Sequence, residues 1–288
     1  MTPPNGQSNF AQSLAFKSVE IEELADVYFF RPAGSLIARA ARALGLTPTG
    51  LTIGATLLGI AGGVLLYNDR LGLVAFVFLI LHSIVDSADG QLARMTGRET
   101  ELGRVLDGLS GYATHAAIYF AIAAGLVHRG GSPWTFTWMF IAGMATAVHA
   151  GMYDYHRNAY IAVVEEAQVP RYSTAKVPAW ISWLFAVYLL AQRSLVGSHT
   201  KVEAILSSPA LGSRVPDEER QRYREIFYPL VRGWNFLGDN TRFFAMGVLV
   251  CLHRIELYFV FVLAPMNLAF VLLWFWQRSA DRRFLASV

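Results

Sequence analysis

Long apolar stretches determine what this 288-residue chain can fold into. Apolar residues make up 54% of the sequence and charged residues only 16%, and the mean hydropathy is +0.38. A soluble domain of this length is normally less apolar. Several of the runs approach the ~20 residues that an α-helix needs to cross a bilayer. Because backbone polar groups in lipid must be satisfied internally, we expect an all-α polytopic membrane protein.

We expect six core transmembrane helices. The pattern places them at Leu51–Tyr67, Leu71–Ala93, Glu101–Val127, Trp134–Tyr155, Phe243–His253 with a short backward extension, and Leu257–Trp276. Gly59 and Gly63 give the first of these helices a face on which a neighbouring helix can approach closely. Lys and Arg gather on one side if the segment between the second and third helices is cytoplasmic. We therefore expect an integral protein of the cell (inner) membrane.

The remaining segments flank or interrupt this membrane core. Residues 1–30 read as a polar tail followed by a short surface helix, and residues 31–288 as one membrane-embedded domain. Ala33–Leu44 predicts an amphipathic helix that lies in the headgroup plane or packs on the rest of the protein. A cytoplasmic helical insertion is expected at about 158–238. Within it, we favour an interfacial helix for Pro178–Leu195 over a seventh span.

Three aspartates stand where two apolar runs meet. Asp86 and Asp89 share one helical face, and a second helix, joined to the first near Thr96–Thr100, would bring Asp107 beside them. A carboxylate at the centre of a membrane helix costs about 2.5–3.5 kcal/mol. Three neighbouring carboxylates also repel one another, so they call for a cation, and all-oxygen ligation suits Mg²⁺ or Mn²⁺. The alternative is a purely structural polar cluster between helices.

The segment around these aspartates resembles the signature of the CDP-alcohol phosphotransferase (CDP-alcohol phosphatidyltransferase) family. That signature reads Asp-x2-Asp-Gly-x2-Ala-Arg-x8-Gly-x3-Asp-x3-Asp. This chain matches it at Asp86, Asp89, Gly90, Ala93, Arg94, Gly103 and Asp107. It departs from it at the last position, where Gly111 stands in place of the fourth Asp. The resemblance extends over roughly Arg31 to Tyr155.

The resemblance implies a metal-dependent transferase of phospholipid or related polar-lipid biosynthesis. Such an enzyme moves a phosphatidyl or phosphoalcohol group from a CDP-linked donor, CDP-diacylglycerol or a CDP-alcohol, to an alcohol or phospho-alcohol acceptor and releases CMP. It works in the lipid bilayer with its site facing the cytoplasm, family members are often homodimers, and no nucleic acid takes part. A transporter that couples ions through the aspartates is a further alternative, but it leaves the Gly-Ala-Arg-Gly spacing unexplained.

The resemblance also implies roles for individual residues. Asp86, Asp89 and Asp107 would hold Mg²⁺ or Mn²⁺. Arg94 would bind a phosphate or one of the aspartates. The nucleotide would lie against the small or polar positions Gly90, Ala93, Gly103 and Thr52. The small residues are equally compatible with close helix packing, and the Thr52 hydroxyl with a bond back to its own helix.

Gly111 stands in place of the Asp that the family is expected to use as general base, so this chain lacks that carboxylate. We consider three hypotheses. His115, four residues further along the same helical face, takes the acceptor's proton. Alternatively, the acceptor oxygen is already ionised, as on a phosphate, and needs no base. In the third hypothesis the protein is a non-catalytic relative that binds the CDP-lipid without turning it over.

Overall fold

The computed structural model describes residues 20–168, 192–207 and 214–287. Within these ranges every regular element is a helix and no strand occurs, as expected for an all-α membrane protein. The predicted interfacial helix at Pro178–Leu195 lies almost wholly outside the described residues. The chain divides into two compact units. Unit 1 consists of Met1–Gly143 and Phe243–Phe261, and unit 2 of Met144–Arg242 and Val262–Val288.

Unit 1 begins with a π-helical segment, η1 (Asp26–Phe30), that runs directly into α2 (Arg31–Ala43). The helix ends at Ala43, and Gly45, two residues later, adopts the left-handed φ of +70° that glycine tolerates best. Its buried face consists of small residues and packs on α4. These residues are Gly34, Ser35, Ala38 and Ala41. The packed arrangement is thus observed for α2, and its other face leaves Leu36, Arg39 and Arg42 exposed.

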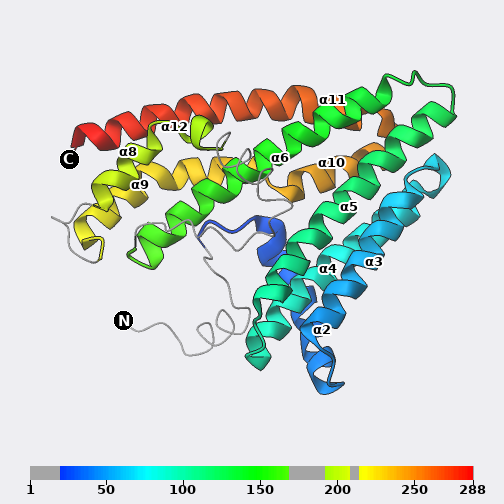
Figure 1. The fold of residues 1–288 in the computed structure, drawn as a ribbon, viewed down its shortest axis with the longest axis horizontal. Helices are drawn as coiled ribbons and strands as arrows, with labels where there is room; N and C mark the ends of the chain where they lie inside the picture. Colours follow the sequence, from blue (N-terminus) through cyan, green and yellow to red (C-terminus); the bar gives the residue numbers. More distant parts are fainter. Residues whose placement is uncertain (1–19, 169–191, 208–213, 288) are drawn as a thin grey trace. The chain divides into compact units, whose positions relative to one another are not determined.

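Three long helices of unit 1 pack together and carry the candidate site (Figure 1). They are α3 (Pro48–Leu65), α4 (Gly72–Thr96) and α5 (Glu101–His128). The start of α3 follows from sequence, because Thr47 caps it by accepting the Gly50 N–H at 3.1 Å and Pro48 occupies its first turn. A short 3₁₀ turn, η2 (Asp69–Leu71), joins α3 to α4.

Glycines on α3 allow the close packing of these helices. A Cβ at Gly62 would stand 2.9 Å from Leu79 of α4, and a Cβ at Gly63 would stand 2.8 Å from the backbone nitrogen of Ile118 on α5. Both distances are shorter than real side-chain contacts allow. The small-residue face predicted for the first apolar helix is therefore used against α5, and Gly62 adds a contact with α4.

The C-terminal part of unit 1 packs through aromatic residues. Phe243 of α10 (Asp239–Cys251) lies 4.9 Å from Phe76 of α4, measured between ring centroids. Gly247 follows one turn later, where a Cβ would collide with the Phe76 ring at 2.4 Å. Tyr119 of α5 contacts the rings of Tyr258 and Phe259 in α11 (Tyr258–Phe261), which follows the 3₁₀ turn η6 (Ile255–Leu257). Unit 1 also contains the first residues of α6 (Thr135–Tyr160).

Four candidate membrane spans are found in the described part of the chain. Helical segments with enough length and apolar character are Pro48–Leu65, Asp69–Thr96, Leu106–His128 and Ile255–Ser287. The protein is thus an integral membrane protein. Helices α6 and α10 occur where the fourth and fifth spans were expected. That these two also cross the membrane stays a prediction, because α10 has only 13 residues and α6 falls short of the hydropathy required.

Unit 2 is organised around α12 (Asn267–Ser287), which packs against α8 (His199–Leu206) and α9 (Asp217–Trp234). The shorter elements of this unit are η3 (Ile161–Glu165), η5 (Asn235–Leu237) and η7 (Val262–Met266). Helix α9 lies within residues 158–238, where a helical insertion was expected, and it begins with a run of charged residues that includes Glu218, Glu219 and Arg220. Besides its solvated face, it buries an aromatic face that the charge pattern did not suggest, formed by Tyr223, Phe227 and Trp234.

A buried polar network joins α8, α9 and α12 of unit 2. Asp281 accepts hydrogen bonds from Ser198 at 2.7 Å and Gln277 at 3.0 Å, and its other contact is with His199 Nδ1 at 2.8 Å. The second ring nitrogen of His199 lies 3.1 Å from the Tyr223 hydroxyl. Buried polar groups require such partners, so the network fixes how α8 and α9 attach to α12.

Candidate active site

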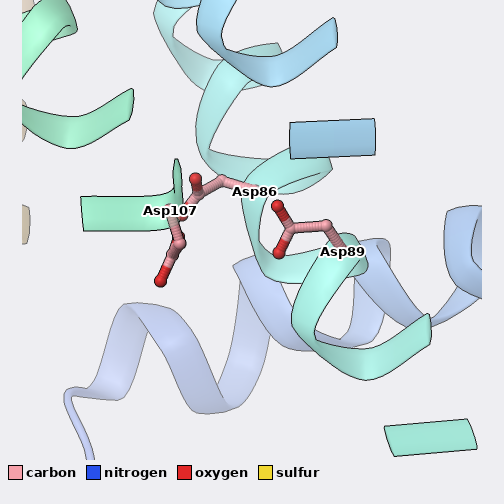
Figure 2. Close-up of side chains that lie close together, drawn as sticks. All are labelled: Asp86, Asp89 and Asp107. Atoms are coloured by element: carbon pink, nitrogen blue, oxygen red, sulfur yellow. The ribbon is translucent and has the colours of Figure 1, made fainter. Parts of the chain in front are cut away.

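The three aspartates of the signature come together between α4 and α5. Asp86 and Asp89 project from α4 and Asp107 from α5, as Figure 2 shows. One carboxylate oxygen from each lies within 4.8 Å of the others. Their exposure is graded, because Asp89 is only 6% exposed, Asp86 is half-buried and Asp107 is exposed. The expected juxtaposition is therefore observed, and the cluster is open on the Asp107 side.

A sharp reversal of the chain produces this geometry. Helix α4 ends at Gly97, whose left-handed φ of +63° lets the Arg98 N–H bond back to the Ala93 carbonyl at 3.0 Å. Helix α5 starts immediately afterwards, where the Thr100 hydroxyl accepts the Gly103 N–H at 3.0 Å. The connection is thus the one expected near Thr96–Thr100. It returns α5 alongside α4 so that Asp107 reaches the level of Asp86.

The donor set fits a hard divalent cation. All three side chains offer carboxylate oxygens, which Mg²⁺ and Mn²⁺ prefer to nitrogen or sulfur. Two unit charges 4 Å apart repel by about 4 kcal/mol at an effective dielectric constant of ~20. Arg94 lies close enough to Asp89 to offset part of this charge, while Asp107 adds to it. A cation between the carboxylates would remove the remaining repulsion.

Thr52 of α3 holds the most buried aspartate. Its hydroxyl donates to Asp89 Oδ2 at 2.6 Å, a length typical of a hydrogen bond to a charged carboxylate. The Pro48 carbonyl of the same helix lies further away, at 3.1 Å. Thr52 was expected in the nucleotide pocket or bonded to its own helix. The structure shows the contact with its own helix and adds a shorter one, with an aspartate of the cluster, that was not predicted.

The other signature residues surround the cluster on α4 and α5. The guanidinium of Arg94 lies over Gly90, 3.4 Å from the position a Cβ would take there. Arg94 is exposed and Ala93 half-buried, so both can be reached from outside. Gly103 sits in the first turn of α5, where its N–H is already engaged by Thr100. A nucleotide role for these residues stays a prediction.

Gly111 leaves open space where the family signature has its fourth Asp. A Cβ at this position would meet no other atom within 4 Å. One turn further, His115 Nδ1 lies 2.9 Å from the Gly111 carbonyl. Because a carbonyl can only accept, Nδ1 must carry the proton in this contact, and neutral His115 then has its lone pair on Nε2. The ring is therefore held in a tautomer that can accept a proton.

A second hydroxyl contact was missed by the sequence analysis. Thr56, one turn beyond Thr52 on α3, lies 2.7 Å from the Ser110 hydroxyl on α5. Ser110 stands next to Gly111 and three residues after Asp107. The i, i+4 spacing of the two threonines could have suggested a shared face. His82 of α4, one turn before Asp86, contacts the Ala55 carbonyl of α3 at 2.8 Å.

Comparisons with known proteins agree with this site. A family model described as CDP-alcohol phosphatidyltransferase matches residues 45–209. An archaetidylinositol phosphate synthase of Pyrococcus horikoshii is 31% identical over 107 residues, which cover 37% of this chain and 54% of that protein. The chain thus spans about half the length of the curated relative it matches. Because the family match covers more than half of the chain and includes the whole clustered signature, this protein belongs to the CDP-alcohol phosphatidyltransferase family.

Proposed function

We propose that this protein transfers a phosphatidyl or phosphoalcohol group from a CDP-linked donor to an alcohol acceptor and releases CMP. The observation that carries the proposal is the cluster of Asp86, Asp89 and Asp107, whose carboxylate oxygens lie within 4.8 Å of one another. Family membership supports the same reaction class. The product would be a phospholipid or a related polar lipid made in the bilayer.

The residues of the cluster would bind and orient the donor. Asp86, Asp89 and Asp107 would hold Mg²⁺ or Mn²⁺, which when bound neutralises charge on the bridging and leaving oxygens of the pyrophosphate. Thr52 keeps the Asp89 carboxylate in place. The exposed guanidinium of Arg94 is available for a phosphate oxygen. Gly90, Ala93 and Gly103 leave room for the nucleotide beside these groups.

The chemical step joins the acceptor oxygen to the β-phosphorus of the donor. The bond from that phosphorus to the bridging oxygen breaks, and CMP leaves with the bridging oxygen. The acceptor's hydroxyl proton must go to a base, and we assign it to Nε2 of His115, which the Gly111 carbonyl leaves free of a proton. If the acceptor oxygen is already ionised, His115 is dispensable, and the space at Gly111 accommodates the acceptor's charge.

Three further points are part of the proposal: the side of the membrane, the acceptor and the oligomeric state. We place the site on the cytoplasmic side of the cell membrane, because CDP compounds are made in the cytoplasm and positive residues gather on that side. We also propose a phospho-alcohol as an acceptor worth testing, since the similar protein is named for the synthesis of archaetidylinositol phosphate. A homodimer is proposed from the family alone.

The test is a transfer assay with purified protein. Radiolabelled CDP-diacylglycerol and a soluble CDP-alcohol would be supplied in turn with Mn²⁺ and a panel of alcohols, including inositol and inositol phosphate. We expect CMP release from at least one pair, and its loss in Asp89→Asn. Full activity of His115→Ala would exclude the histidine as base and favour an ionised acceptor.

A second candidate function is binding without turnover. It is favoured by one observation, the replacement of the fourth Asp by Gly111. Tight binding of CDP-diacylglycerol that requires Mn²⁺, with no CMP formed from any acceptor, would support this candidate. A protein that neither binds CDP compounds nor releases CMP would contradict both.

A further inference from the structure

The Thr56 and Ser110 hydroxyls form a partly buried contact between α3 and α5, and neither residue has a role in the proposed reaction. Their oxygens lie 2.7 Å apart, and Ser110 is only 2% exposed. Thr56 also lies 2.7 Å from the Thr52 carbonyl of its own helix. Since a carbonyl only accepts, Thr56 can donate to it while accepting the Ser110 proton. Both hydroxyl protons are then used, which a buried polar pair requires.

Helix α3 makes two such bonds, one to each helix that carries aspartates. The Thr52 hydroxyl bonds to Asp89 on α4, and the Thr56 hydroxyl, one turn later, bonds to Ser110 on α5. Ser110 lies one turn after Asp107 on the same helix. Helix α3 is thus hydrogen-bonded both to the helix that carries Asp89 and to the helix that carries Asp107.

Close packing beyond the hydroxyl pair keeps the contact in register. A Cβ at Gly59 of α3 would stand 2.2 Å from the Thr114 hydroxyl oxygen, so α5 approaches α3 to nearly backbone distance. A Cβ at Gly63 would stand 2.9 Å from the Cβ of Ala117, which is also closer than real contacts allow. An apolar interface of small residues can slide along the helix axis by a fraction of a turn at little cost. A directional hydroxyl pair cannot, because its hydrogen bond would break.

We propose that Thr56 and Ser110 are positioning residues of the metal site. They hold Asp107 at the distance from Asp86 and Asp89 that a shared cation needs, against the mutual repulsion of the three carboxylates. The inference rests on the proposed function, because it assumes that the aspartates bind a divalent ion. It assigns the residues no contact with the ion or with either substrate.

The experiment measures Mn²⁺ binding to the detergent-solubilised full chain in the absence of substrate. Free Mn²⁺ would be followed by electron paramagnetic resonance, and thermal unfolding recorded in parallel. The variants are Thr56→Val, which keeps the shape but removes the hydroxyl, and Ser110→Ala. Thr56→Ser restores the hydroxyl. Ser83→Ala is the matched control, because the Ser83 hydroxyl bonds within α4, to the Leu79 carbonyl at 3.1 Å.

We expect the apparent Kd for Mn²⁺ to rise about tenfold in Thr56→Val and in Ser110→Ala, as for other groups that orient metal ligands. Thr56→Ser and Ser83→Ala should keep the affinity of the unmodified protein. A lower unfolding temperature with unchanged Mn²⁺ affinity would assign the pair to helix packing alone and overturn the inference. If either Thr56→Val or Ser110→Ala fails to fold, the Mn²⁺ affinity of the other variant tests the inference.

The same titration separates this inference from the proposed function. Asp89→Asn is included as the reference for loss of the metal site. If the unmodified protein binds no Mn²⁺, or binds it as well with Asp89→Asn, the metal site itself is wrong and the inference falls with it. If Asp89→Asn abolishes binding while both hydroxyl variants retain it, only the positioning role is wrong.

Discussion

Thr52 donates a 2.6 Å hydrogen bond from α3 to Asp89 of α4, and the two residues are both buried. The bond connects the start of the first apolar helix with the least exposed member of the aspartate cluster. A buried carboxylate without such a donor would pay the full cost of its desolvation. Asp89 is thus kept in one orientation by a residue that lies 37 positions earlier in the chain.

The first prediction concerns this bond. In Thr52→Val the Asp89 carboxylate loses its threonine donor while the side-chain shape is kept. We expect the Mn²⁺ concentration for half-maximal CMP release to rise about tenfold and the protein to lose about 1–3 kcal/mol of stability. Thr52→Ser should behave like the unmodified protein. An unchanged Mn²⁺ dependence in Thr52→Val would show that the bond does not orient a ligand.

The second prediction uses the repulsion within the cluster. Asp107→Asn removes one charge, so the metal-free protein should become more stable, by less than about 1 kcal/mol because Asp107 is exposed and its charge is screened. The increase in unfolding temperature on adding Mn²⁺ should disappear. Asp69→Asn is the control, since Asp69 pairs with Arg129 at 3.0 Å at the other end of α4. Compared with the unmodified protein, Asp107→Asn should therefore unfold at a higher temperature without Mn²⁺ and at a lower temperature with it.

The third prediction compares two glycines of α3 by thermal unfolding in detergent. Gly63→Ala would place a Cβ 2.8 Å from the backbone nitrogen of Ile118, and backbone cannot move aside as a side chain can. We expect it to destabilise the protein by about 1–3 kcal/mol. Gly54→Ala meets nothing within 4 Å and should be neutral or stabilise by up to about 1 kcal/mol. Equal effects of the two substitutions would contradict the α3–α5 packing described here.

The fourth prediction concerns the open space at Gly111. Gly111→Ala meets no atom within 4 Å, so it should stabilise α5 by about 0.5–1 kcal/mol. If an acceptor occupies that space, its KM should rise while the KM for the CDP donor stays the same. Gly108→Ala, also free of neighbours within 4 Å, is the matched control for helix stability. No change in acceptor KM would place the acceptor elsewhere.

Much of the candidate site could be predicted from the sequence because its parts are local. The i, i+3 spacing of Asp86 and Asp89 puts both on one face of any helix. The turn between α4 and α5 was predictable as well, since Gly97 ends one helix and Thr100 caps the next. Once two adjacent helices reverse direction, Asp107 is expected on the side of Asp86 and Asp89, although its distance from them depends on how the helices pack.

The partners of these groups could not be predicted in the same way. Thr52 and Asp89 are 37 residues apart, and Thr56 and Ser110 are 54 apart. In unit 2, His199 and Asp281 are 82 apart. No periodicity within one helix indicates which residue of another helix will face it. The crossing of two helices depends on how their ridges and grooves fit.

By itself, the amino-acid sequence determined that the chain is helical and membrane-embedded, because uninterrupted apolar runs can satisfy their backbone groups in lipid only as helices. It also determined the aspartate signature, because residue spacing within a helix is a local property. Only the tertiary structure decided that Thr52 and Thr56 lie against the two aspartate-bearing helices. It also showed that Gly111 faces open space. Both depend on how α3, α4 and α5 pack, and the residues that meet there are far apart in the chain.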